Sequence, residues 1–310
     1  MISEVYPTPG EVDAWCEALV ARADAARVTV KPVAGCPYDF RLGVWQGQAE
    51  SRYVAFSSRG LRTFYGYWQT IPSGGPAPTL IHLPGYGAEM SAHPELVAAG
   101  YNVLHVNPLG YATPQGPAED LRGADGAWPV LPDTAASGGK RGYRDWLRDA
   151  VVAANWVRQQ PQVQPDRLAV FGTSQGGGTA LLLASLLRER GIRAVAADQP
   201  FLTNFRMMED CEEKGAYGLV FPFLETLDSK RQAAAWRALG FIDTASHAHR
   251  LTMPTLLTAG GVDTVCPAAT IQALFAALPG TRSLTEIAGQ AHGYNQPFVQ
   301  LATAWFRSFV

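Results

Sequence analysis

The chain has 310 residues, of which 47% are hydrophobic and 17% are charged, and its formal net charge is −2. At this length one α/β domain can bury a full core without disulfides or metals, so we expect a single domain over residues 1–310. The near balance of 25 basic and 27 acidic residues argues against the basic face of a nucleic-acid-binding protein. We therefore expect no nucleic-acid partner.

Targeting and redox signals are weak. No stretch reaches the 18 apolar residues of a membrane-spanning helix, and the first residues lack the basic and apolar regions of a signal peptide. These features predict a cytoplasmic protein with no membrane partner. The cysteines are widely spaced and form no Cys-x-x-Cys pair, so we interpret them as free thiols. They are Cys16, Cys36, Cys211 and Cys266.

The first part of the chain, residues 1–78, is expected to form an extension of one helix and a few strands. Apolar residues recur three and four apart from Glu11 to Arg27, which predicts a helix with one buried face. Alternating apolar residues then indicate a strand pair. We expect strands at 53–56 and 63–68, a turn at 57–60 and a surface loop at 72–78.

From residue 79 onward, short apolar runs alternate with helical patterns. Strands that alternate with helices imply right-handed crossovers and a mostly parallel sheet with helices on both faces. The predicted fold class is therefore α/β. We expect strands at 79–83, 102–106, 168–171, 194–197, 255–258 and 283–287, and helices at 94–99, 143–160, 176–190, 268–278 and 297–309.

Two long segments, 107–142 and 201–245, interrupt this alternation. Insertions of this length usually cap or line a binding site, so we expect them to act as lid or pocket insertions. Their aromatic side chains could form a sugar platform, although core packing is the default interpretation for most of them. These residues are Tyr111, Trp128, Phe201, Phe205, Tyr217, Phe221 and Phe223.

The sharpest chemical signal is Gly172-Thr-Ser174-Gln-Gly176, which fits the Gly-x-Ser-x-Gly pattern of a nucleophile elbow. The elbow requires a strand, a tight turn and a helix, and the flanking residues predict that order. The start of a helix also places partial positive charge beside the serine. We therefore predict Ser174 as a nucleophile, with an ordinary glycine-rich turn as the alternative.

An activated serine needs a base, and the base needs an acid that orients it. In the α/β-hydrolase order the acid follows the serine and the histidine comes last. His292 follows the last predicted strand, where a loop can return it to the carboxyl edge of the sheet. Asp263 follows the strand at 255–258 and is the expected acid, with Asp198 and Asp243 as alternatives.

The other histidines have different expected places. His82 and His105 lie inside apolar strands, so we interpret them as core residues. His247 and His249 precede a strand and are interpreted as surface or second-layer residues. His93 stands before a proline, where a position at the mouth of the site stays open.

A tetrahedral intermediate needs two preorganised N–H donors. The residue after the nucleophile, Gln175, is one expected donor. The loop Pro84-Gly-Tyr86-Gly87 follows the strand at 79–83 and is expected to supply the other through Tyr86, unless it is a plain tight turn. No phosphate-binding loop or dinucleotide motif is present, so we expect no cofactor and no metal.

With these motifs, the sequence resembles carbohydrate esterase family seven, the acetyl xylan esterase and cephalosporin C deacetylase group of α/β-hydrolases. The similarity covers most of the chain and is strongest over residues 163–180, where the family's Gly-x-Ser-Gln-Gly-Gly signature puts its nucleophile on Ser174. The resemblance also puts the acid on Asp263 and the oxyanion tyrosine on Tyr86. The chain departs from the family at Asn107-Pro-Leu-Gly110, where Arg-Gly-Gln is usual, and at His292-Gly293, where His-Glu is usual.

The resemblance implies an α/β-hydrolase fold with cap-like insertions and a serine esterase that works without a cofactor. The implied reaction removes small acyl groups, above all acetyl, from a sugar or related alcohol through an acyl-enzyme. The alternatives are a broad carboxylesterase, an acyl-peptide hydrolase or a catalytically silent hydrolase fold used for binding. The implied partner is a small-molecule ester, and a homo-oligomer is left open because the family's typical assembly is a hexamer.

Overall fold

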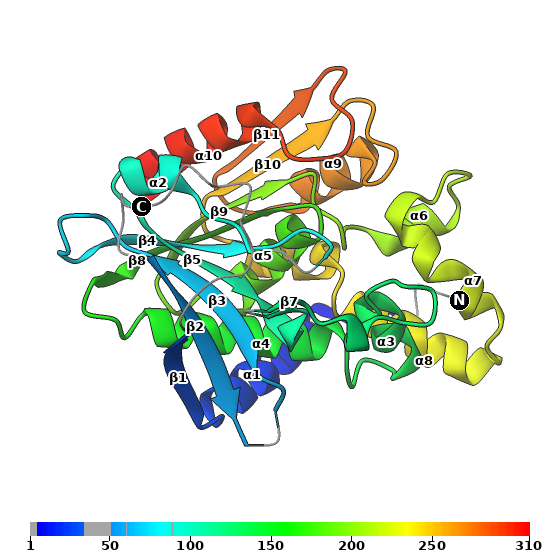
Figure 1. The fold of residues 1–310 in the computed structure, drawn as a ribbon. Coiled ribbons are helices and arrows are strands. Elements are labelled where there is room, and N and C mark those ends of the chain that lie inside the picture. Colours follow the sequence, from blue (N-terminus) through cyan, green and yellow to red (C-terminus); the bar gives the residue numbers. More distant parts are fainter. Residues whose placement is uncertain (1–4, 34–50, 60, 88–89, 114) are drawn as a thin grey trace.

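The computed structural model describes residues 5–33, 51–59, 61–87, 90–113 and 115–310. Within these residues, a nine-stranded sheet forms the centre of the molecule (Figure 1). The strands lie in the order β1 (Val28–Val33), β2 (Ser51–Ser58), β3 (Phe64–Gln69), β5 (Asn102–Asn107), β4 (Ala77–Leu83), β8 (Val163–Thr173), β9 (Ile192–Asp198), β10 (Thr255–Gly260) and β11 (Arg282–Ile287). The five neighbouring pairs from β5 to β11 are parallel, and the three pairs from β1 to β5 are antiparallel. This arrangement confirms the predicted mostly parallel sheet.

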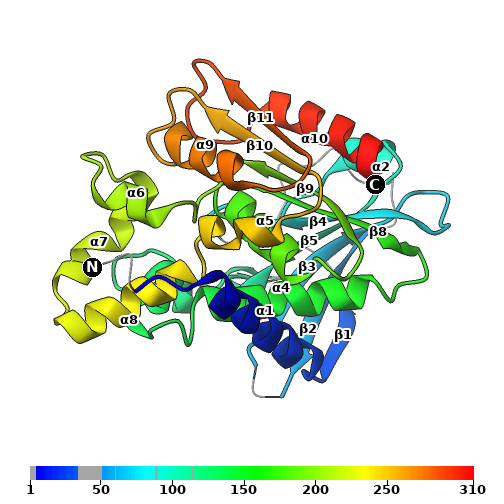
Figure 2. The same ribbon diagram turned by 180° about the vertical axis from the view of Figure 1, so that it is seen from behind.

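Helices cover both faces of the sheet (Figure 1, Figure 2). One face carries α1 (Pro9–Asp24), α4 (Tyr143–Val157), α5 (Gln175–Leu186) and α9 (Ala268–Ala277), and the other carries α2 (Pro94–Ala98) and α10 (Gln296–Phe309). Successive side chains of a strand point to opposite faces, so each central strand serves two cores. In β4, for example, Ile81 and Leu83 join the core under α4 and α5, while Leu80 joins the core under α2 and α10.

The N-terminal helix and first strand differ from the sequence prediction. Helix α1 begins at Pro9, because the Thr8 side chain and Glu11 form a capping box there, and it ends at Asp24. The pattern does not predict β1, which has no buried side chain and contains Pro32. Within the part of the chain that the structure describes, this strand pairs only with β2, at the edge of the sheet, where proline is tolerated.

The two insertions form much of one end of the molecule, where α3 and α8 lie side by side (Figure 1, Figure 2). Their role as a lid or pocket wall stays a prediction. They contain the hairpin β6 (Ala112–Thr113) and β7 (Gly116–Pro117), the helices α3 (Val130–Ala136), α6 (Phe205–Glu209), α7 (Phe221–Glu225) and α8 (Ser229–Gly240), and short 3₁₀ turns at Pro108–Gly110, Glu119–Leu121 and Gly215–Leu219. A further 3₁₀ turn, Thr244–Arg250, leads from the second insertion to β10.

The aromatic residues of the insertions pack into the core. Tyr111 stacks on Trp128 with ring centroids 4.5 Å apart, and Phe201 meets the edge of Tyr217 at 4.8 Å. Of the seven aromatic residues considered above, all except Phe223 are buried. The core-packing interpretation is therefore confirmed for these six. Among the helices of the described residues, none combines the length and the apolar character needed to cross a membrane.

Candidate active site

Ser174 lies at the turn between β8 and α5, as the elbow motif predicts. Its backbone has φ 57° and ψ −121°, a left-handed conformation that is costly for a residue with a side chain. Two hydrogen bonds hold this turn from the end of β9 and the residues after it: Ser174 N donates to Asp198 O at 2.8 Å, and Phe201 N donates to Ser174 O at 2.9 Å. The neighbouring backbones come close, since a Cβ at Gly176 would lie 2.2 Å from Leu83 O.

The structure brings Ser174, His292 and Asp263 into one hydrogen-bonded row. Ser174 Oγ lies 2.8 Å from His292 Nε2, and His292 Nδ1 lies 2.8 Å from Asp263 Oδ2. The Asp263 side chain is fully buried, while the His292 side chain is 20% exposed. A carboxylate only accepts, so Nδ1 carries the ring proton and Nε2 is free to accept the serine proton. The row therefore has the geometry of a serine nucleophile with its base and orienting acid.

The second oxygen of Asp263 is bound by its own loop. Asp263 Oδ1 accepts from Val265 N at 2.8 Å and from Cys266 N at 2.9 Å. These bonds fix the carboxylate, so that its other oxygen faces the histidine. Cys266 is buried in the same loop, and burial raises the pKa of its thiol, which keeps it neutral. The sequence did not single out Cys266, although it lies three residues after the predicted acid.

The two alternative acids are engaged elsewhere. Asp198 accepts hydrogen bonds from Thr173, Thr258 and Asn295, and burial raises its pKa. Asp243 accepts from the Tyr6 hydroxyl and from backbone N–H groups of the second insertion, and burial raises its pKa too. Both carboxyl groups are thus satisfied by partners other than the histidine, whereas Asp263 contacts the His292 ring.

Of the two expected oxyanion donors, Gln175 begins α5 and its side chain contacts the loop that carries Tyr86. Gln175 is 1% exposed, and its amide accepts from the Tyr143 hydroxyl at 2.7 Å and donates to Gly85 O at 3.3 Å. The Tyr86 hydroxyl accepts from Trp128 N at 2.6 Å and donates to Trp128 O at 3.1 Å. The side chain of Gln175 thus fixes the loop that precedes Tyr86, and the Tyr86 side chain fixes that loop to the first insertion.

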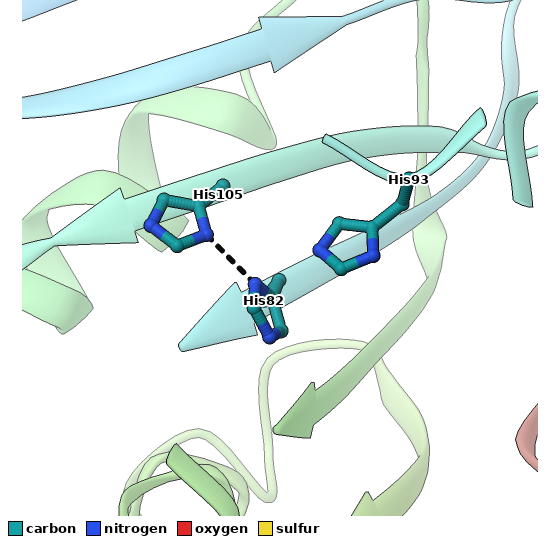
Figure 3. A group of neighbouring side chains, drawn as sticks. All are labelled: His82, His93 and His105. Carbon is teal, nitrogen blue, oxygen red and sulfur yellow. Dashed lines mark hydrogen bonds between the residues drawn. The ribbon is translucent and has the colours of Figure 1, made fainter. Parts of the chain in front are cut away.

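Three histidines meet on the α2 side of the sheet (Figure 3). His82 Nδ1 lies 2.7 Å from His105 Nδ1, and His93 packs against His82 and Phe171. Two nitrogens bound to one tetrahedral zinc ion would lie about 3.3 Å apart, so the observed distance fits a hydrogen bond between two imidazoles better. Burial and the two neighbouring rings lower the pKa of His82 well below its usual value. The structure therefore supports the interpretation of His82 and His105 as buried core residues.

His247 corrects the expectation of a surface or second-layer residue. It is fully buried, with Nδ1 2.8 Å from Ser185 Oγ and Nε2 3.0 Å from Phe241 O. The residues before β10 form a 3₁₀ turn that directs this ring into the core beneath α1 and α5. His249 lies nearer the surface and contacts Asp13. Among the described cysteines, Cys16, Cys211 and Cys266 are free thiols, and Cys36 lies outside the described residues.

The chain is similar to known acetyl xylan esterases along most of its length. The family model described as acetyl xylan esterase (AXE1) matches residues 45–309. The acetyl xylan esterase 1 of Thermoanaerobacterium sp. JW/SL YS485 superposes with a TM-score of 0.80 and 23% identity, over 98% of this chain and 95% of that one. The acetyl xylan esterase of Paenibacillus sp. R4 gives 0.78 and 20%, over 100% and 98%.

A curated relative is also similar in part. The uncharacterized protein YfhR of Escherichia coli strain K12 is 31% identical over 174 residues, which cover 53% of this chain and 52% of YfhR. The chain thus spans about half the length of the curated relatives that it matches. The structural similarities show the α/β-hydrolase fold, and the family match covers well over half of the chain. The chain belongs to the acetyl xylan esterase family of carboxylic ester hydrolases, which confirms the resemblance seen in its motifs.

Proposed function

We propose that this protein is a serine esterase that removes acetyl groups from a sugar or related alcohol. The observation that carries the proposal is the hydrogen-bonded row of Ser174, His292 and Asp263 on a strained elbow. Family membership and the acetyl xylan esterase names of the two similar structures support acetyl esters as the substrate class. The assignment of roles to individual residues is part of the proposal.

In the proposed reaction, Ser174 Oγ attacks the ester carbonyl while His292 Nε2 takes its proton. Asp263 holds Nδ1–H and stabilises the positive charge that forms on the ring. The backbone N–H groups of Tyr86 and Gln175 stabilise the oxyanion, and His292 then gives its proton to the leaving alcohol. Water hydrolyses the acyl-enzyme with His292 again as the base, which releases acetate.

Acetate release from a set of esters tests this proposal. The set contains p-nitrophenyl acetate, butyrate and octanoate together with acetylated xylose, each measured with the unmodified enzyme and with Ser174→Ala. We expect turnover that falls with acyl length, extends to the sugar and drops by at least about a thousandfold in the variant. Turnover that rises with acyl length would favour a broad carboxylesterase, and full activity in Ser174→Ala would contradict the proposal.

A serine-reactive phosphonate tests the alternative of a catalytically silent hydrolase fold. It should label the unmodified chain at Ser174 and leave Ser174→Ala unlabelled, whereas a catalytically silent binding protein would not be labelled in either form. The cytoplasmic location stays a prediction from the sequence, and a homo-oligomeric state stays the open alternative that the sequence left. Sedimentation of the purified protein would measure the second of them.

A further inference from the structure

The side chain of Gln199 bridges the two residues that flank His292. Gln199 Nε2 donates to Ala291 O at 2.8 Å, and Gly293 N donates to Gln199 Oε1 at 2.9 Å. One amide group thus binds the backbone immediately before and immediately after the histidine. Bonds at two points, on either side of one residue, restrict the rotation of that residue's backbone as well as its position.

The histidine loop needs such support because it has no regular structure of its own. It runs from the end of β11 at Ile287 to the start of α10 at Gln296, and Ala291 is exposed. Exposed loops keep conformational freedom unless specific contacts remove it. The row at Ser174 requires His292 Nε2 within hydrogen-bonding distance, so the loop must be held in one conformation.

Gln199 itself is rigidly held. It is 1% exposed and has φ 42°, and its backbone N–H donates to Thr258 O at 3.0 Å as β9 ends. Its amide reaches the loop above Gly260, where a Cβ would lie 2.5 Å from Gln199 Nε2. A left-handed conformation at a buried non-glycine residue is costly and persists only where the surroundings fix it. Because the Gln199 amide passes so close to Gly260, a residue with a side chain would not fit at this position of β10.

The same turn also holds the nucleophile. Asp198 O and Phe201 N bind the backbone N–H and carbonyl of Ser174 at 2.8 and 2.9 Å, and Asp198 accepts from Asn295 at the far end of the histidine loop. Four consecutive residues, 198–201, thus contact both the serine turn and the loop that carries the base. This segment therefore links the position of Ser174 to the position of the loop that carries His292.

We propose that Gln199 is a positioning residue that holds His292 Nε2 within hydrogen-bonding distance of Ser174 Oγ. The proposal rests on the proposed esterase function. The amide acts through the histidine backbone and does not touch the ring or the serine hydroxyl. Its loss should lower kcat through misplacement of the base, while KM, which reflects substrate binding elsewhere, should change little.

Two substitutions of similar size test the proposal. Gln199→Met keeps the length and removes both hydrogen bonds, so kcat for p-nitrophenyl acetate should fall by about ten- to a hundredfold with KM within about threefold. Gln199→Glu introduces a carboxyl that accepts from Gly293 N but, when ionised, repels Ala291 O. When protonated, it has an O–H donor for Ala291 O and a carbonyl acceptor for Gly293 N, which restores both bonds.

The activity ratio of Gln199→Glu to the unmodified enzyme should therefore rise as the pH falls from about 8 to about 5, because burial favours the protonated carboxyl. Asp198, Asp263 and His292 are the ionisable groups beside this position, and Gln199→Met keeps all three, so the activity ratio of Gln199→Met to the unmodified enzyme should stay flat. If Gln199 only stabilised the fold, its substitution would change the melting temperature, and the relative activity of Gln199→Glu would not recover at low pH. The rescue compares Gln199→Glu with the unmodified enzyme at each pH, so it still tests the proposal if Gln199→Met folds poorly.

The outcomes are distinguishable from those of the proposed function. If the unmodified enzyme shows no Ser174-dependent turnover and no phosphonate labelling, the esterase proposal fails and this inference fails with it. If turnover depends on Ser174 but Gln199→Met keeps its kcat within about twofold, or the Gln199→Glu ratio is flat with pH, the inference alone is overturned.

Discussion

The Tyr143 hydroxyl donates a hydrogen bond to Gln175 Oε1 at 2.7 Å, inside the core below the elbow. Tyr143 begins α4 and Gln175 begins α5, so this bond connects the starts of two helices. The other end of the Gln175 amide donates to Gly85 O at 3.3 Å. A buried tyrosine thus fixes, through one amide, the distance between the two loops that carry the expected oxyanion donors.

We expect Tyr143→Phe to destabilise the fold and to lower kcat. The substitution leaves Gln175 Oε1 buried without its donor, which costs about 1–3 kcal/mol, and it lets the amide shift away from Gly85. Tyr217→Phe is the matched control, because that hydroxyl is equally buried but binds the Thr203 backbone. Urea unfolding and kcat for p-nitrophenyl acetate would be measured for both. Equal losses of kcat in the two variants would contradict the positional role of Tyr143.

Asp263→Asn should abolish most of the turnover while Asp243→Asn should not. An amide at 263 disfavours the required tautomer of His292 and no longer stabilises its charge, a change worth about four orders of magnitude in kcat in serine hydrolases. At 243 the same substitution disturbs only the contacts with Tyr6 and the second insertion, so stability should fall and kcat should be retained. A larger loss of kcat in Asp243→Asn than in Asp263→Asn would mean that Asp243, and not Asp263, is the acid that orients His292.

Tyr86→Phe should cost less than about tenfold in kcat. The proposed oxyanion donor is the backbone N–H of Tyr86, which this substitution keeps, whereas removal of an oxyanion donor costs about a hundred- to a thousandfold. Only the two bonds between the hydroxyl and the Trp128 backbone are lost. Steady-state kinetics with p-nitrophenyl acetate would decide. A loss of a hundredfold or more would mean that the hydroxyl, or the tie to the insertion, is essential.

His247 predicts a loss of stability in acid. Burial lowers its pKa from 6.5 to about 4, so the unfolded chain binds the proton more readily between these values. Its contribution is complete above pH 6.5 and is lost as the pH falls towards 4, by about 3 kcal/mol in all. Burial raises the pKa of Asp149 to about 6, and that group works in the opposite direction.

The comparison with His247→Gln separates the two effects, because the variant keeps Asp149 and lacks the titrating ring. Urea unfolding at several pH values would give the free energy of unfolding of both proteins. We expect the advantage of the unmodified protein to shrink from pH 7 to pH 4 as the ring protonates. A difference that does not change with pH would show that the pKa of His247 is the same in the folded and the unfolded state.

Much of the fold could be predicted because the central strands and helices are local patterns. The strands before and after Ser174 have apolar runs bounded by glycines, and the parallel sheet follows from their alternation with helices. Strand β1 could not be predicted, since its pairing with β2 brings together residues on either side of a long intervening segment. The chain order of the candidate site also followed from sequence, and the structure brings Ser174, Asp263 and His292 together.

The sequence by itself determined where each candidate site residue lies relative to the end of a strand. For Ser174 the reason is that the elbow is a local conformation whose close backbone contacts require glycines at 172 and 176. Only the tertiary structure decided what holds those ends together. Gln199 hydrogen-bonds the residues beside His292, and Tyr143 hydrogen-bonds Gln175. The partners lie far apart in the sequence, so no local sequence pattern predicts these bonds. The same holds for His247, whose turn looks polar but faces the core. The physical reason is that hydrogen bonds between distant residues depend on how the strands are ordered in the sheet, and that order is set by packing of the whole chain.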